Sequence, residues 1–164
     1  MKQEQQKSEE SMTFNSTVAL IGVFGGLIWS LVGYLAFYLN FTRVGPALAL
    51  MPWALGEWKH GWLGQLIGIV FISLVSIGAA FIYRLIFAKI NKTWPGMLFG
   101  LVLWILIFGL FNPMFPELKP LTQLDLNTII TNICLYLIYG LFIGYSISYE
   151  YQERNTQDGE AIQS

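Results

Sequence analysis

Charged residues are scarce in this chain, and cysteine and histidine are almost absent. Only 12% of the 164 residues are charged, whereas a soluble domain carries about 25%. Cys134 is the single cysteine, which excludes a disulfide within the chain. With one cysteine and one histidine, the chain cannot build a metal site on those two ligand types. We therefore expect no metal and no cofactor.

A strong net charge is also missing, as are the common catalytic signatures. The formal net charge is −1, so no overall field favours binding to nucleic acid. The sequence contains no nucleophile-elbow motif, no glycine-rich phosphate loop and no zinc signature. These absences argue against a nucleic-acid partner and predict that the protein is not an enzyme.

What the chain does have is four long apolar segments. They cover residues 18–39, 62–83, 95–111 and 129–149, and none of them contains a charged residue. A bilayer core of about 30 Å is crossed by about 20 helical residues. Helices also satisfy their own backbone hydrogen bonds, which lipid cannot do. The sequence therefore predicts an all-α polytopic membrane protein with four transmembrane helices.

The two ends of the chain differ in composition from this apolar middle. Residues 1–17 and 150–164 are rich in glutamine, glutamate, serine and asparagine, a composition typical of disorder. We expect two disordered tails around one transmembrane domain that covers residues 18–149.

Positive charges are distributed unevenly between the connections. Residues 84–94 hold three cations and no acid, and the tails hold three more cations. The longer connections, 40–61 and 112–128, together hold only three. Because short cytoplasmic loops carry an excess of lysine and arginine, we place both termini and residues 84–94 in the cytoplasm of a bacterial cell. The sequence thus predicts a multi-pass protein of the cell membrane.

Each apolar segment carries two glycines four residues apart. In membranes, small residues at this spacing let helix backbones approach closely. We interpret the pairs as helix-packing positions, mainly within one chain, and leave self-association open. The pairs are Gly22/Gly26, Gly64/Gly68, Gly96/Gly100 and Gly140/Gly144.

The fourth apolar segment also carries a polar stripe. At about 100° per residue the stripe lies away from the glycines, so we expect this helix to be the most enclosed of the four. One interpretation is hydrogen bonding between helices. The alternative is a polar cavity or solute path shared with Gln65, Ser73 and Ser76 of the second segment. The stripe consists of Thr128, Asn132, Tyr139 and Ser146.

The connection between the first two segments is itself apolar. Its residues 45–53 include two prolines and are too few to span a bilayer, which predicts an interfacial or re-entrant segment near 45–60. Glu57, Lys59 and His60 follow, and histidine titrates between about pH 5 and 8. They are the weak candidates for an outer-face site, the competing interpretation being a solvated cluster at headgroup level.

Several short motifs are spread over about residues 15–152. They are Gly22-Val23-Phe24-Gly25-Gly26, Met51-Pro52-Trp53, Trp62-Leu63-Gly64-Gln65, Lys89-Ile90, Trp94-Pro95-Gly96 and Asn112-Pro113. In these motifs the chain resembles the YqhR-type membrane proteins of Bacillus-like bacteria. This resemblance implies four spans and assigns no activity. A weaker resemblance, to the YagU-like inner-membrane proteins, implies a role in envelope or acid stress.

Three functions agree with these features to different extents. The favoured hypothesis is a non-enzymatic scaffold or accessory subunit of a membrane assembly, because the spans are free of charge and have small-residue faces. The alternative is a small-solute or lipid transporter or channel that uses a polar path between the second and fourth spans. An intramembrane enzyme would have to use the 57–60 cluster. Expected partners are the lipid bilayer, another membrane protein or a second copy of the chain.

Overall fold

Four long helices make up most of the computed structural model. The structure describes residues 2–52, 56, 61–90, 92–115, 118–120 and 123–163, and it describes side chains only for those between residues 13 and 156. The 3-10 helix η1 (Pro46–Leu50) follows the first long helix. The long helices are α1 (Lys2–Tyr38), α2 (Trp62–Phe87), α3 (Trp94–Ile105) and α4 (Leu126–Gln163).

The predicted all-α polytopic membrane architecture is confirmed. Three helical segments are long and apolar enough to cross a bilayer: Thr13–Tyr38, Trp62–Phe87 and Leu126–Thr156. The remaining apolar helix, Trp94–Leu110, is shorter. It consists of α3 and a continuing π-helical segment, η3 (Leu106–Leu110).

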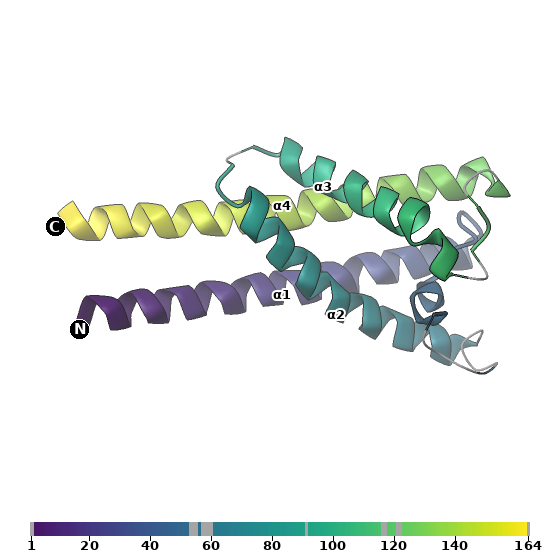
Figure 1. Cartoon of the computed structure of the whole chain (residues 1–164), viewed down its shortest axis with the longest axis horizontal. Helices are drawn as coiled ribbons and strands as arrows, with labels where there is room; N and C mark the ends of the chain where they lie inside the picture. Colours follow the sequence, from purple (N-terminus) through teal and green to yellow (C-terminus); the bar gives the residue numbers. More distant parts are fainter. Residues whose placement is uncertain are drawn as a thin grey trace.

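The helices are arranged as two pairs. The largest contacts join α1 to α2 and α3 to α4, and a smaller contact joins α1 to α4. By contrast, α2 and α3 hardly touch (Figure 1). Both termini lie at the same end of the molecule (Figure 1). We call this the termini end. The opposite end, which holds the described residues of 39–61 and 111–125, we call the loop end.

The solid part of the interior lies toward the termini end. Val18 of α1, Ala80 and Tyr83 of α2, and Ile143 and Ile147 of α4 have no exposed surface and form one cluster. Close packing of this kind fixes the relative positions of the helices. All four long helices contribute to this cluster, because Phe99 of α3 also belongs to it.

Tyr83 and Phe99 mark the place where α2 and α3 approach each other. Their ring centroids are 5.2 Å apart in an edge-on arrangement, which is favourable for aromatic pairs. Toward the loop end the two helices are no longer packed together. The space between them therefore widens from this aromatic contact toward the loops.

The helices α1 and α4 extend beyond the predicted spans. The sequence predicts disordered tails, whereas α1 begins at Lys2 and α4 ends at Gln163. Part of the extension is explained by Phe14, which is buried against Tyr151 with ring centroids 6.1 Å apart. The guanidinium of Arg84 lies 4.5 Å from the centre of the Phe14 ring. The guanidinium of Arg154 on α4 lies 5.5 Å from the same ring. Cation–π and apolar contacts thus hold α1 to both α2 and α4 past the span.

Asn40 ends α1 and sets the direction of the next segment. Its φ of 61° lies in the left-handed region, which asparagine tolerates at a helix C-terminus. The N–H of Phe41 then donates to the carbonyl of Ala36 at 2.9 Å. This termination turns the chain back toward the helices, so that Thr42 is 2% exposed.

The segment near 45–60 that is predicted to be interfacial or re-entrant includes η1, while its residues 53–55 and 57–60 lie outside the described residues. Ala47 and Leu50 are buried, and the backbone of Pro46 lies against Gly68, where a Cβ would clash with it. Gly68 is six residues into α2, about 9 Å along the helix. The segment therefore folds back beside α2 instead of lying over its end.

Candidate binding groove

Glycines bring α1 and α2 into backbone contact. A Cβ at Gly22 would lie 2.8 Å from the Cα of Ile77, and one at Gly26 would lie 2.7 Å from the Cα of Ser73. Both distances are shorter than ordinary van der Waals contact, so only glycine allows this approach. Gly64 is buried on α2.

The pairs on α3 and α4 contact each other reciprocally. A Cβ at Gly144 would lie 2.6 Å from the Cα of Gly96, and one at Gly100 would clash with the carbonyl of Tyr136. A Cβ at Gly140 would lie 2.6 Å from the Cα of Gly100. These glycine contacts lie within one chain. They bring α3 and α4 into backbone contact, as the glycines of α1 do for α1 and α2.

A cavity of about 500 Å³ occupies the space that widens between α2 and α3. Its lining comes from all four long helices and from the segment around η1. Most lining side chains are aliphatic or aromatic. The polar exceptions are Ser30, Ser76, Asn132, Tyr136 and Tyr139. We call this cavity the groove.

One wall of the groove is formed by the π-helical segment η3. The N–H of Phe111 donates to the carbonyl of Leu106 at 2.8 Å, five residues back, which is the π-helical pattern. Ile107, Phe108 and Phe111 line the groove, and Phe108 is stacked on Trp104 at 5.6 Å. Single π turns inside α-helices are frequent at functional sites.

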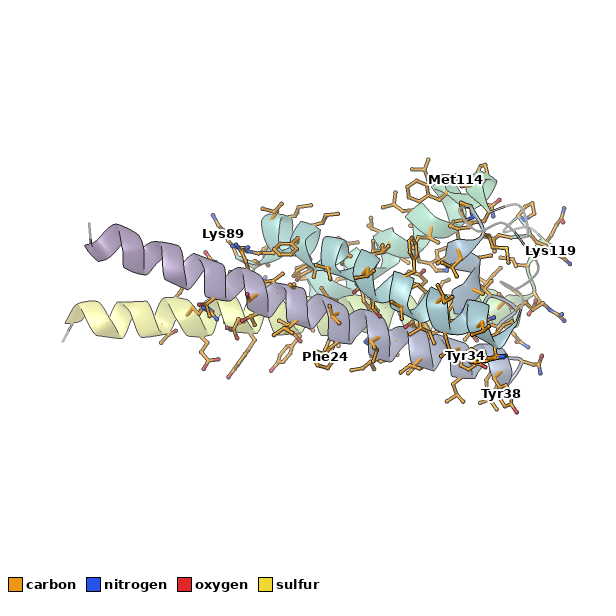
Figure 2. All side chains as sticks on the ribbon, turned by 90° about the horizontal axis from the view of Figure 1, so that it is seen from below. Phe24, Tyr34, Tyr38, Lys89, Met114 and Lys119 are labelled. Carbon is orange, nitrogen blue, oxygen red and sulfur yellow. The ribbon has the colours of Figure 1, made fainter. Side chains whose placement is uncertain are left out.

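The groove opens to the outside at the level of the middle of α2. Val75 lines it and is 57% exposed. Met114, a second exposed lining residue, lies at the loop end (Figure 2). Val75 is the fourteenth residue of the 26-residue helix α2. In a spanning helix this level faces the hydrocarbon of the bilayer. The mouth of the groove is therefore directed toward lipid.

The inner limit of the groove is a pair of hydroxyls that joins α4, α2 and α1. The Ser76 hydroxyl donates to the Gly22 carbonyl at 2.7 Å, and it lies 2.6 Å from the hydroxyl of Tyr139. Because serine has a single hydroxyl proton, Tyr139 is the donor in the second bond. At this level α2 and α4 are thus joined by a hydrogen bond between two side chains.

Polar residues gather at the loop end of the groove, where α4 begins. The side-chain nitrogen of Asn132 donates to the Thr42 hydroxyl at 2.8 Å and to the Thr128 carbonyl at 2.7 Å. The N–H of Arg43 donates to the Thr128 hydroxyl at 3.0 Å. Asn132, Thr42 and Thr128 are all buried. They hold the chain after α1 against the first turns of α4.

Asp125 caps the N-terminus of α4. Its carboxylate accepts from the N–H of Thr128 at 3.2 Å and from the Thr128 hydroxyl at 3.0 Å, as expected for an N-cap residue. It also forms an ion pair with Arg43 at 3.2 Å. The hydrogen bonds from Thr128, aided by the charge of Arg43, lower the pKa of the Asp125 carboxyl below its usual value.

The other predicted polar residues are separated from this cluster. The side-chain oxygen of Gln65 accepts from the N–H of Ala47 at 3.1 Å and so fixes η1 on α2. Ser146 is half-buried farther along α4. Glu57, Lys59 and His60 lie outside the described residues. Among the described residues, no group of three histidine, cysteine or acidic side chains is placed to hold a metal.

The prediction that the fourth span is the most enclosed is wrong. Only 22% of its apolar window is buried, compared with 28% for α1 and 33% for α2. The reason is that α4 packs on α3, α1 and α2 with part of its surface only, while one face of it has no neighbour among the described residues. That outward face consists of Ile130, Cys134, Ile138, Tyr145 and Tyr149, all exposed.

The groove itself was missing from the sequence-based predictions. Most of its lining residues are ordinary apolar side chains, and only the Asn112-Pro113 motif and the segment near 45–60 indicated irregular backbone there. Asn132, Tyr139 and Ser76 were selected from the sequence as polar, and the structure places them at the two limits of the groove.

The chain matches one protein family and one curated relative. The family, described as "Conserved membrane protein YqhR", matches over residues 1–161. The relative is the "Uncharacterized protein YqhR" of Bacillus subtilis (strain 168). It is 49% identical over 154 residues, covering 94% of this chain and 85% of the relative. No solved structure matches the chain. The chain belongs to the YqhR family of conserved membrane proteins.

Proposed function

We propose that the protein is a non-enzymatic membrane protein that binds the hydrocarbon chain of a lipid in the groove between α2 and α3. The observation that carries this proposal is the mainly apolar cavity whose mouth opens at mid-span. Its volume of about 500 Å³ lies within the range of about 300–1,000 Å³ typical of small-molecule sites. Lipid chains are the apolar molecules that are always present at this level.

A polar solute path between α2 and α4 is less well supported. The hydrogen bond between Ser76 and Tyr139 closes the inner limit of the groove, and beyond it α2 and α4 are packed together in the core cluster. Charged side chains, which usually mark ion and proton paths, are absent from the residues that line the groove. Passive handling of lipid is therefore the favoured form of the transporter hypothesis.

A role as an accessory subunit of a membrane assembly is a second candidate. The observation that favours it is the unpartnered outward face of α4, which includes the exposed Tyr145 and Tyr149 stacked at 6.1 Å. Photocrosslinking from position Ile138 in cell membranes would identify a partner protein or a second copy. A product that contains only lipid would count against this role.

The lipid proposal is tested with a phospholipid that carries a photoreactive diazirine in one acyl chain. The protein is reconstituted in vesicles with this lipid, irradiated and digested, and the labelled residues are located by mass spectrometry. Two valines of α2 give matched variants. Val75→Trp fills the mouth of the groove, whereas Val70→Trp changes a residue of the same exposure, 58%, that does not line it.

We expect the wild type and Val70→Trp to be labelled at groove residues such as Phe108 and Leu135. Val75→Trp should lose this labelling and keep labelling at the outward residue Ile138. Equal labelling of the groove in all three proteins, or none in the wild type, would contradict the proposal.

The proposed orientation places both termini and the connection between α2 and α3 in the cytoplasm. Figure 2 shows Lys89, in this connection, and Lys119 at opposite ends of the span region. In a Cys134→Ala background, a membrane-impermeant maleimide should label Lys119→Cys in intact cells. It should label Lys89→Cys only after the membrane is opened. The reverse pattern would invert the orientation.

A further inference from the structure

Asn132 lies at the loop end of the groove and is almost fully buried. Its side chain is 6% exposed and lines the groove. The residue is seven positions, or about 10 Å, along α4 from Tyr139 at the inner limit. The groove therefore has a polar group at each limit, and the stretch of about 10 Å between them is lined mostly by apolar side chains, with Tyr136 as a polar exception.

The hydrogen bonds of Asn132 determine which of its atoms remains available. Both bonds formed by its side chain are donated by the nitrogen, to the hydroxyl of Thr42 and to the carbonyl of Thr128. A carbonyl can only accept, so the nitrogen must face Thr128, and this fixes the orientation of the amide. No described residue donates a hydrogen bond to the side-chain oxygen. This oxygen is a free acceptor at the edge of the groove.

At the inner limit the situation is different. The Ser76 hydroxyl donates its hydrogen bond to the Gly22 carbonyl, and the Tyr139 hydroxyl donates its hydrogen bond to Ser76. These groups are already paired with each other. Trp29 also lines the groove and has a buried N–H without a partner among the described residues, but this group can only donate. Asn132 therefore offers a free acceptor to an occupant whose chain extends toward Tyr139.

We propose that the groove selects a lipid with a free hydroxyl where its chains meet its polar part, as in a diacylglycerol, and that this hydroxyl donates to the side-chain oxygen of Asn132. This inference rests on the proposed lipid-binding function and adds the class of ligand. A molecule without a hydrogen-bond donor would leave this buried acceptor unpaired, and its binding is weaker for that reason.

The position of Asn132 agrees with the ordinary orientation of such a lipid. Asn132 is the seventh residue of α4 and lies next to the polar cluster at the loop end, where the polar part of a lipid is found. The apolar stretch toward Tyr139 accommodates only the first part of a chain. The remainder leaves the groove through the mouth at Val75 and continues into the bilayer.

Two photoreactive probes that differ in one group test this inference. The first is a diacylglycerol with a diazirine in one acyl chain, and the second is the same molecule with its hydroxyl methylated. Each is reconstituted with the wild type, with Asn132→Leu and with Thr42→Val, and labelling of groove residues is quantified by mass spectrometry. Thr42→Val is the matched control, because it removes the same hydrogen bond to Asn132 and keeps the acceptor.

In the wild type the hydroxyl probe should label the groove about three to ten times more than the methylated probe, as one buried hydrogen bond allows. Thr42→Val should keep this preference, and Asn132→Leu should lose it. Equal labelling by the two probes in the wild type would overturn the inference. This outcome does not depend on whether any variant folds. Equal labelling of the groove by both probes leaves lipid binding intact. Absence of groove labelling by either probe would contradict lipid binding itself.

Discussion

Tyr139 of α4 donates a hydrogen bond of 2.6 Å to Ser76 of α2, and the Ser76 hydroxyl in turn donates to the carbonyl of Gly22 in α1. Three helices thus meet at one pair of hydroxyls. We predict that Tyr139→Phe lowers the free energy of unfolding by about 0.6 kcal/mol, the average for such bonds in membranes. Unfolding by denaturant in mixed micelles measures the change.

Tyr145→Phe is the control for this prediction. It removes the same hydroxyl from the same helix at a position that is 62% exposed. Its unfolding free energy should equal that of the wild type. If both variants lose the same stability, the bond to Ser76 contributes nothing specific.

The glycines between α3 and α4 give a second prediction. Gly140→Ala should destabilise the monomer by about 1–3 kcal/mol, the usual range for overpacking, because its Cβ would enter the backbone of Gly100. In Gly78→Ala the new Cβ meets no atom within 4 Å. This control should be neutral or up to about 1 kcal/mol more stable, since alanine favours helix. Thermal unfolding in detergent compares the two.

The oligomeric state of the variants shows whether the glycine pairs act within one chain or between copies of it. If Gly140→Ala dissociates an oligomer while the unfolding midpoint of the monomer is unchanged, the pair acts between copies. Gly144→Leu is a stronger test of the same kind. It should destabilise the monomer itself, because the new side chain would meet Gly96 and Tyr83.

Stability at low pH should depend on Asp125. The folded-state pKa of its carboxyl is lowered, mainly by hydrogen bonds from Thr128. Its contribution is therefore present above the unfolded pKa of about 3.9 and is lost as pH falls through the folded pKa. We expect Asp125→Asn to lose less stability than the wild type between pH 5 and 3 (about one unit either side of that value).

Asparagine is the appropriate replacement, because it also caps helix N-termini and carries no charge. Unfolding transitions at several pH values measure the difference. Parallel acid profiles of the wild type and Asp125→Asn would contradict the assignment of the acid response to this carboxyl.

Phe14 should hold the extended first turns of α1 in place. Phe14→Leu removes the cation–π contacts with Arg84 and Arg154, 4.5 and 5.5 Å away, and keeps an apolar side chain. We expect faster hydrogen exchange in residues 13–17, with unchanged exchange around Tyr83. The lipid-facing Phe24, 56% exposed, is the control, since Phe24→Leu should change neither region.

The architecture could be predicted from the sequence because each span is a long run without charge. Pro95 lies in the first turn of α3, as expected for proline at a helix start. The extensions of α1 and α4 could not be predicted in this way. They depend on Phe14 meeting Tyr151 and Arg154, which are more than a hundred residues away in the chain.

The groove was equally inaccessible from the sequence. A cavity arises where two helices do not pack against each other. Nothing in the sequence around Val75 or Phe108 indicates that a neighbouring helix is absent there. The polar stripe of the fourth segment was read from spacing alone, but Thr42, the partner of Asn132, lies in a loop without periodicity. The suggested link to envelope or acid stress stays a prediction.

The two-pair arrangement also has a consequence for biogenesis. In each pair the glycine contacts join helices that follow one another in the chain, α1 with α2 and α3 with α4. Contacts between neighbours in sequence form early and need no distant segment. The first hairpin can therefore close in the membrane while the ribosome is still making the second. The groove comes into existence only when the second hairpin docks on the first.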